Sequence, residues 1–206
     1  MPDSIAGIDV SRETIADLQA FGALVTKWTP KINLIARSTV ASVWDRHIVD
    51  SAQLYRFAPK TYEKWVDMGS GGGFPGIVMA ILAKTQQPQV QFTLIESDQR
   101  KATFLRTAVR ECGLEAAVIA DRIENAPVQE ADVVSARALT ALSALLPSAQ
   151  RHLNDDGIAL FHKGRQAAQE IADAQKNWSF DLEDYASITD PDARILAIQR
   201  IKARGQ

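Results

Sequence analysis

The chain has 206 residues, of which 46% are hydrophobic and 23% are charged, and its formal net charge is −2. These values are typical of one folded domain and exclude an intrinsically disordered chain or a collagen-like repeat. The single cysteine, Cys112, excludes an intrachain disulfide and a cysteine-based metal cluster, and the net charge gives no whole-molecule attraction to nucleic acid.

No targeting or membrane segment is predicted. The first residues include Asp3 and Asp9 and contain no apolar run, which argues against a signal peptide. A transmembrane helix needs about 18 or more apolar residues in succession, and the sequence has no such stretch. We therefore expect a cytoplasmic protein with no membrane association.

Two helical segments are predicted at the start of the chain. Ser11 is a suitable N-cap for an amphipathic helix over 11–28, in which apolar residues recur at spacings of three and four. Pro30 is expected to interrupt this helix, and a second helical segment is expected over 38–57. We expect residues 1–60 to form a helical extension packed on the rest of the chain.

From residue 64 onwards, short apolar strands alternate with helices. Strands are expected at 65–68, 90–95, 116–120, 131–135 and 158–161, and helices at 77–82, 101–112, 139–150 and 166–175. This alternation predicts βαβ units and a mostly parallel sheet. The last two strands, expected at 179–187 and 193–202, are joined by a turn without a helix, so the sheet is expected to end antiparallel. We expect residues 61–206 to form one compact domain, with the extension packed on it rather than stable by itself.

A glycine-rich loop lies between the first strand and the first helix of this sheet. It runs from Asp67 to Gly76 with the sequence Asp-Met-Gly-Ser-Gly-Gly-Gly-Phe-Pro-Gly. Doubly wound sheets bind ligands at the carboxyl ends of their strands, and glycines let the backbone approach a ligand closely. A phosphate-binding P-loop requires Lys and then Ser or Thr after the last glycine, and Ile77 and Val78 occupy those positions.

Two interpretations of the loop remain. A dinucleotide-binding G-x-G-x-x-G pattern is met by Gly71, Gly73 and Gly76. The acid-x-Gly-x-Gly-x-Gly pattern of S-adenosylmethionine (SAM) loops is met by Asp67, Gly69, Gly71 and Gly73. The SAM interpretation is favoured because SAM carries cationic groups, which suit a nearby acid, and no phosphate that would need a helix N-terminus.

Residues after the next two strands fit a nucleoside. Glu96 ends the strand expected at 90–95, about 20 residues after the loop, where an acid binds ribose hydroxyls. Ile123 and Glu124 follow the third strand, where adenine would lie. We therefore predict a nucleoside-containing cofactor.

The sequence also resembles the GidB/RsmG-type bacterial methyltransferases, which methylate N7 of a guanine in small-subunit ribosomal RNA. The similarity runs from Leu18 to Arg204 and is carried by these blocks: Asn33-Leu34, Arg46-His47-Ile48-Val49-Asp50-Ser51, Gly69 to Gly76, Arg100-Lys101-x-x-Phe104-Leu105, Ser135-Ala136-Arg137-Ala138 and Lys163-Gly164. The resemblance implies an α/β fold of the Rossmann-like class I methyltransferases. In that fold a mostly parallel seven-stranded sheet has an antiparallel last strand and carries an N-terminal helical cap. It further implies SAM as cofactor and 16S rRNA as substrate, with the target guanine at position 527 in bacterial reference numbering.

The resemblance implies roles for individual residues as well. It assigns SAM contacts to Gly69, Phe74, Ile123, Glu124 and Arg137, and it places on the side where RNA enters Asn33, Arg46, His47 and Lys163. Two positions depart from the family pattern. Ile35 stands where relatives often have Thr, so this position offers no hydroxyl for a contact. Glu96 stands where many have Asp, which should preserve the ribose contact with a longer side chain.

The residue types fit guanine N7 better than other methyl acceptors. Carbon 5 of a pyrimidine needs a nucleophile, and Cys112 lies on the apolar face of its helix, as a core residue does. Exocyclic amines usually call for an Asn- or Asp-Pro-Pro-aromatic loop, whereas Ser135-Ala136-Arg137-Ala138 stands here. N7 has a free lone pair and no proton, so positioning suffices. The positioning candidates are Arg137, Asn33 and His47, with a general-base role for His47 disfavoured.

Several basic side chains are candidates for RNA contact: Lys31, Arg46, Arg100, Lys101, Lys163 and Arg165. Asp50 is expected to pair with Arg46, four residues earlier on the same helix face. Because the net charge is slightly negative, affinity for naked RNA should be modest and salt-sensitive. Together with the family resemblance, this favours the small ribosomal subunit as substrate. No metal site is predicted, since His152 and His162 lack metal-ligand spacing.

Three other functions stay open on the residues alone. A nicotinamide-dependent oxidoreductase is disfavoured because no Tyr-x-x-x-Lys pair occurs. A non-catalytic RNA-binding factor is disfavoured because the cofactor loop is intact. Methyl transfer to a small molecule or a protein is opposed by the family resemblance only.

Overall fold

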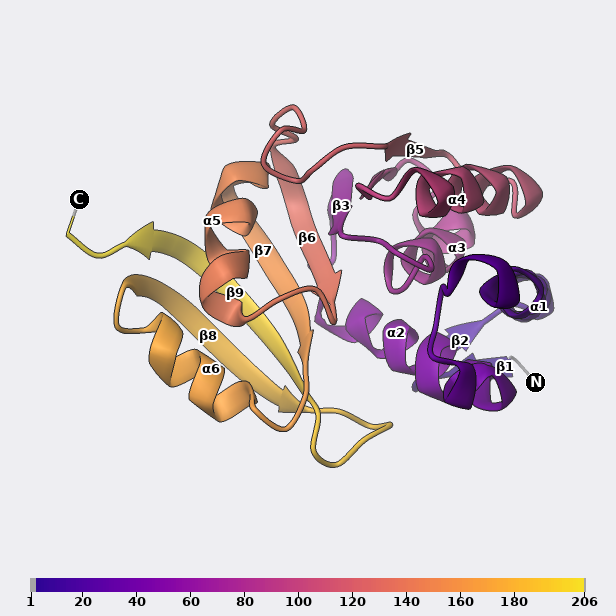
Figure 1. The fold of residues 1–206 in the computed structure, drawn as a ribbon, viewed down its shortest axis with the longest axis horizontal. Coiled ribbons are helices and arrows are strands. Elements are labelled where there is room, and N and C mark those ends of the chain that lie inside the picture. The colour runs from indigo at the N-terminus through magenta and orange to yellow at the C-terminus, as the bar shows by residue number, and fades with distance from the viewer. Residues whose placement is uncertain (1–2, 206) are drawn as a thin grey trace.

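A seven-stranded sheet runs through the protein, whose computed structural model describes residues 3–205 (Figure 1). Its strands are β3 (Lys64–Met68), β4 (Gln91–Ile95), β5 (Ala116–Ile119), β6 (Ala131–Arg137), β7 (Leu153–Lys163), β8 (Trp178–Ala186) and β9 (Arg194–Ala203). They lie in the order β5-β4-β3-β6-β7-β9-β8. β9 is antiparallel to both of its neighbours, and the other adjacent pairs are parallel. The predicted mostly parallel sheet with an antiparallel last strand is confirmed.

Helices cover both faces of the sheet and bury one apolar core on each. The helices of the βαβ units are α3 (Gly76–Gln86), α4 (Gln99–Glu111), α5 (Leu142–His152) and α6 (Ala167–Ala174). One core contains Trp65 and Phe104 together with α3 and α4, and the other contains Leu146 and Phe161 beneath α5. α3 is buried from Gly76 to Ala83, as expected of a helix that is apolar all round.

The chain begins with a hairpin that we did not predict. Its strands are β1 (Asp3–Ile5) and β2 (Ile8–Val10), and both turn residues, Ala6 and Gly7, have positive φ of 52° and 78°. A two-residue turn with both φ values positive matches the twist of a hairpin. The alternation of apolar and polar residues around Gly7 was the available signal.

Helix α1 (Arg12–Ile32) begins where the sequence predicts and continues further. The Ser11 Oγ accepts the Thr14 N–H at 3.1 Å, which confirms the N-cap. The expected interruption at Pro30 is wrong, because the helix continues to Ile32. A proline costs the helix one hydrogen bond, and here packing of Ile32 on the apolar core keeps the last turn in place.

The predicted second helical segment is confirmed, but its turns are irregular. It consists of a 3₁₀ helix (Arg37–Ser42), a π-helix (Trp44–Val49), α2 (Asp50–Ala52) and a second 3₁₀ helix (Gln53–Phe57). The wider π turn changes the side-chain spacing, so the expected pair of Arg46 with Asp50 is wrong. Arg46 lies 3.9 Å from Asp190, and Asp50 pairs with Arg137. Among residues 3–205, no helix has the length and apolar character to cross a membrane.

Candidate functional site

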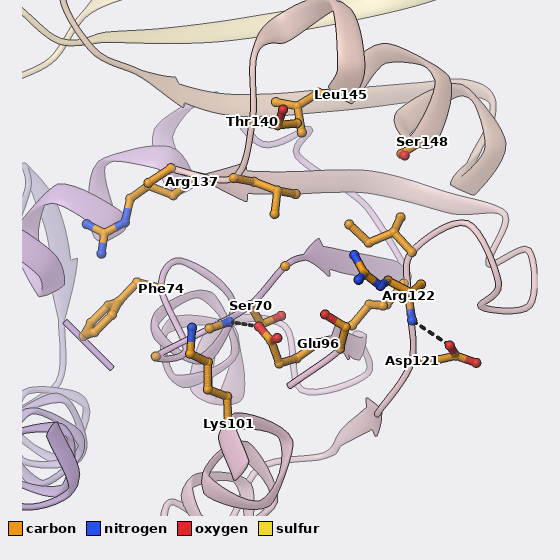
Figure 2. Close-up of a pocket in the computed structure, with 18 of the residues that line it drawn as sticks. Ser70, Phe74, Glu96, Lys101, Asp121, Arg122, Arg137, Thr140, Leu145 and Ser148 are labelled. Carbon is orange, nitrogen blue, oxygen red and sulfur yellow. Dashed lines mark hydrogen bonds between the residues drawn. The ribbon is translucent and has the colours of Figure 1, made fainter. Parts of the chain in front are cut away.

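A cavity of about 610 Å³ opens at the carboxyl ends of β3, β4 and β6, where the strand order reverses (Figure 2). This is the place where open α/β sheets bind their ligands. Its walls are the glycine loop, the ends of β4 and β6, the loop at 121–124 and one face of α5. Seven of the nine predicted cofactor residues line it: Gly69, Gly71, Phe74, Glu96, Ile123, Glu124 and Arg137.

The glycine loop forms one wall through a left-handed backbone. Gly69 and Gly71 have φ values of +65° and +54°, which side chains rarely tolerate. Two hydrogen bonds join the loop to the end of β4, from the Ser70 N–H to the carbonyl oxygen of Ile95 at 3.0 Å and from the Gly71 N–H to Glu96 Oε2 at 2.8 Å. The second of these bonds is drawn in Figure 2.

Glu96 is fixed at the end of β4 with both carboxylate oxygens in use. Its Oε2 accepts from the loop, and its Oε1 accepts the Asp98 N–H at 2.8 Å. Each carboxylate oxygen has a further lone pair, so Glu96 can still accept hydroxyl hydrogens from a ligand.

Two members of the glycine motif lie beneath the cavity wall. Asp67 is 1% exposed, and its Oδ1 accepts the Ser135 hydroxyl at 2.6 Å. Burial raises the pKa of Asp67 to about 6. A Cβ on Gly73 would lie within 2.9 Å of both Ile77 and Phe21. The structure therefore gives both residues a supporting position under the loop rather than a place on the cavity surface.

A second cavity, of about 540 Å³, lies beside the first and shares the wall formed by residues 137–140. Its other walls come from the helical segment at 39–50, the end of β7, α6 and the loop before β9. The predicted residues Arg46, His47 and Lys163 line it, whereas Asn33 does not. Within residues 3–205, only the segment 137–140 lines both cavities.

Arg137 lies at the boundary between the two cavities and its side chain is only 16% exposed. Its Nη1 donates to Asp50 Oδ2 at 3.0 Å, and its Nη2 donates to His47 Nδ1 at 2.7 Å. The guanidinium carbon lies 5.0 Å from the centre of the Phe74 ring, within cation–π range. Figure 2 shows Arg137 and Phe74 on the same side of the cavity.

His47 is held as a neutral acceptor. Arginine can only donate, so His47 Nδ1 accepts with its lone pair and the ring hydrogen is on Nε2. This Nε2–H donates to the Thr39 hydroxyl, with 2.8 Å between the nitrogen and the oxygen. Burial, followed by the charge of Arg137, lowers the pKa of His47 to about 4. Because its lone pair is occupied, His47 orients Arg137 and has no free lone pair to act as a general base.

Asp50 joins its own helical segment to β6, β7 and the loop before β9. These contacts were not predicted from the sequence. Asp50 Oδ1 accepts the Thr189 hydroxyl at 2.6 Å and the Gln53 amide at 2.9 Å. Its backbone carbonyl oxygen accepts His162 Nε2–H at 2.8 Å. Burial acts to raise the pKa of Asp50, and the opposing interactions with His162, Thr189 and Arg137 hold it below its ordinary value. The Arg-His-x-x-Asp-Ser block was visible in the sequence, but its partners, 87 to 139 residues away, were not.

The predicted RNA-contacting side chains lie in different surroundings. Lys163 is 7% exposed and its Nζ donates to Glu170 at 2.7 Å and to the carbonyl oxygen of Thr140 at 2.6 Å, so its charge is already neutralised. Lys101 lines the first cavity. The remaining four are solvent-exposed: Lys31, Arg46, Arg100 and Arg165.

Two further predictions concern the single residues Asn33 and Cys112, and a third concerns metal binding. Asn33 is exposed and ends α1 in a left-handed conformation with φ of 50°, next to Leu34, which contacts the glycine loop. Cys112 is buried in the core, as predicted, and burial raises its pKa to about 11. Within residues 3–205, no group of three or more His, Cys, Asp or Glu side chains is placed to hold a metal ion.

Known proteins resemble this chain in sequence and in fold. A family model described as GidB, rRNA small subunit methyltransferase G, matches residues 14–195. A ribosomal RNA small subunit methyltransferase G from Cereibacter sphaeroides is 54% identical over 197 residues, 96% of each chain. One from Rhodospirillum centenum is 51% identical over 203 residues, 98% of this chain and 92% of the relative.

Solved structures extend the likeness to the fold. The ribosomal protein L11 methylase from Lactobacillus delbrueckii subsp. bulgaricus has a TM-score of 0.60 at 18% identity, covering 75% of this chain and 78% of the other. M. jannaschii TYW2, in complex with AdoMet, has a TM-score of 0.57 at 14% identity, covering 76% of each chain. At these identities the likeness shows a shared fold only.

Proposed function

The chain belongs to the GidB family of rRNA small subunit methyltransferases G, and from that premise we propose that it transfers the methyl group of SAM to N7 of one guanine in 16S rRNA. The observation that carries this proposal is the pair of adjacent cavities with a common wall at residues 137–140. We propose that SAM occupies the cavity against the glycine loop and that the target guanine enters the other.

The residues of the first cavity fit SAM. Its volume of about 610 Å³ lies in the range of cofactor sites, roughly 300–1,000 Å³. Glu96 suits ribose hydroxyls, the side chains of Ile123 and Leu145 suit the adenine ring, and Arg137 suits the carboxylate. When bound, SAM supplies a methyl group on a positively charged sulfur. The glycine loop lets that ligand approach the backbone without meeting a side chain.

The second cavity suits a base taken out of its stack. Enzymes that modify a base bind it in a pocket of this kind, away from its neighbours in the RNA. Guanine N7 offers its lone pair and has no proton to lose, so no general base is needed and the work of the chain is orientation. The neutral His47 fits this task, because it holds Arg137 without adding a second positive charge near an acceptor that becomes cationic.

We propose the assembled small ribosomal subunit as the substrate and the cytoplasm as the place of action. The net charge is −2. Two exposed arginines among the predicted RNA-contacting residues lie near an acid, Arg46 near Asp190 and Arg165 near Asp192. Weak naked-RNA binding is therefore expected. A folded particle supplies additional surface for recognition.

We also propose that residues 1–60 and 61–206 fold as one unit. α1 packs on α3 and α4, and one apolar core contains Phe21 and Leu54 from the first part with Met79 and Phe104 from the second. A single unfolding transition, seen alike by fluorescence and circular dichroism, is the expected result. Two separate transitions would contradict it.

Methyl transfer tests the function directly. Labelled SAM is incubated with the protein and small ribosomal subunits from a strain that lacks its gene, with naked rRNA in parallel, and the label is mapped to a base. We expect label at N7 of a single guanine, with more in the subunits than in the naked RNA. Label in neither RNA, together with retained SAM binding, would contradict the proposed substrate.

A further inference from the structure

The segment that separates the two cavities is a short loop with little support of its own. Residues 138–141 connect β6 to α5, and Ala138 has a positive φ of 51°. Ala141 occupies the N-cap position of α5, where an alanine offers no side-chain acceptor for the free N–H groups of the first turn. The loop therefore depends on other elements to fix its position.

Two side chains from outside the loop provide this support. Glu170 of α6 places its Oε2 2.7 Å from the Leu142 N–H, so it caps α5 from another helix. Lys163 at the end of β7 donates from Nζ to the same Oε2 at 2.7 Å and to the carbonyl oxygen of Thr140 at 2.6 Å. A carboxylate at a helix N-terminus is favoured by the helix dipole, and the ammonium neutralises it in a place where water has little access.

We infer that Lys163 and Glu170 form a clamp that sets the position of the 138–141 loop and thereby shapes both cavities. Lys163 is then a positioning residue rather than a ligand of RNA phosphate. Lys163 is 7% exposed, and its ammonium group donates to a carboxylate and a carbonyl oxygen, so it would have to break both bonds to reach a phosphate. Because Ala138, Leu139 and Thr140 line the SAM cavity as well, the clamp acts on SAM affinity even without RNA. The inference deepens the proposed function, since it rests on SAM binding in that cavity.

Lys163→Met and Glu170→Ala test the clamp, alone and combined. We expect each single variant to weaken SAM binding by roughly fivefold to tenfold in calorimetry without RNA, since a charge-assisted bond is lost. We expect the double variant to be no worse than the more harmful single one. Glu170→Gln should weaken SAM binding less than Glu170→Ala, because one amide oxygen can accept both bonds that Oε2 accepts now, although the buried Lys163 ammonium loses its counter-charge in both variants.

Matched controls come from another lysine–acid pair. Lys176 lies 2.6 Å from Asp173, their side chains are 69% and 47% exposed, and neither residue lines either of the two cavities described above. Lys176→Met and Asp173→Asn should leave SAM affinity unchanged. Amide hydrogen exchange of peptides over 138–145 should be faster in Lys163→Met and Glu170→Ala than in the wild type and in both controls.

The salt dependence of RNA binding separates the clamp from a phosphate contact. Losing one phosphate contact lowers the slope of log K against log salt by about 0.7 to 0.9. We expect Lys163→Met to leave this slope unchanged. Unchanged SAM affinity and loop exchange, with a reduced slope, would overturn the inference and make Lys163 a phosphate ligand. A wild-type protein that binds SAM but methylates no rRNA would contradict the proposed function, while exchange and SAM affinity would still decide about the clamp.

Discussion

The buried pair of Asp50 and Arg137 yields a prediction whose size follows from the structure. The two side chains are each 16% exposed and their charged atoms lie 3.0 Å apart. Removing one partner of such a pair leaves a buried charge without compensation, which costs about 3–5 kcal/mol. We expect Asp50→Asn to cost about 3–4 kcal/mol of unfolding free energy, because the buried Arg137 loses its counter-charge and a single amide oxygen cannot replace both carboxylate oxygens, which now accept from Arg137, Thr189 and Gln53.

Removing the arginine instead of the aspartate should cost less unfolding free energy. In Arg137→Met, Asp50 keeps hydrogen bonds from Thr189 and Gln53, so we expect a loss of about 2–3 kcal/mol. The double variant removes both charges together and should cost only about 3–4 kcal/mol. The coupling energy between the two positions is therefore expected to be about 2–3 kcal/mol.

Urea unfolding at pH 7 of the wild type, both single variants and the double variant measures this coupling. The exposed pair of Arg165 and Asp192, 3.8 Å apart with side chains 81% and 64% exposed, is the control and should show almost none. A coupling below about 0.5 kcal/mol for Asp50 and Arg137 would refute the reasoning, because the two side chains would then contribute independently.

Three further predictions concern the SAM cavity and the pH dependence of stability. Gly69→Asp should abolish SAM binding in calorimetry, because a Cβ at this position would lie 2.5 Å from Leu139 Cδ1 and would displace that side chain, which lines the same cavity. Gly7→Asp, with φ of +78° and nothing within 4 Å, is the control for backbone strain and should bind SAM normally. Glu96→Gln should weaken SAM binding about tenfold, since its amide NH₂ would face a backbone N–H that Glu96 now accepts; unchanged affinity would place the ribose elsewhere. Burial lowers the pKa of His162 from 6.5 to about 4, so between these values the folded state binds fewer protons than the unfolded state and this histidine makes stability rise with pH. In His162→Gln, the urea midpoint should rise less between pH 4 and 6.5 than it does in the wild type. Asp67, whose pKa is raised to about 6, acts in the opposite direction in the wild type and the variant alike. An equal slope of urea midpoint against pH in the two proteins would contradict this role of His162.

The sheet and the SAM loop were predictable because their signals are local. The switch from helical periodicity to short apolar strands after residue 64 gave the βαβ order, and the position of Glu96 after the second strand gave the acid beside the loop. Both signals depend on neighbours in the sequence. They needed no knowledge of which distant side chains meet.

The second cavity was not predictable in the same way. Lys163 follows a strand in a Lys-Gly dipeptide, which gave it the pattern of a loop lysine, whereas β7 extends to this residue and turns it inward to Glu170. Asp50 was assigned a partner four residues away because α-helical spacing was assumed, and the π turn before it breaks that spacing. In both cases tertiary contacts decided the partner of a charged side chain.

The geometry of Arg137 reconciles a structural and a ligand-binding role in one residue. A guanidinium has five N–H donors in a fixed plane. Bonds to Asp50, the carbonyl oxygen of Arg46 and His47 use the two hydrogens of Nη1 and one of Nη2. The Nε–H and one Nη2–H have no acceptor among residues 3–205, and the side chain lines both cavities. A lysine, with one point charge on a flexible stem, cannot divide its donors between a buried carboxylate and a ligand in this way. An arginine at this position therefore lets the π-helical segment hold the wall shared by the two cavities, while the same side chain keeps N–H donors for a ligand of the first cavity, which we propose to be the carboxylate of SAM.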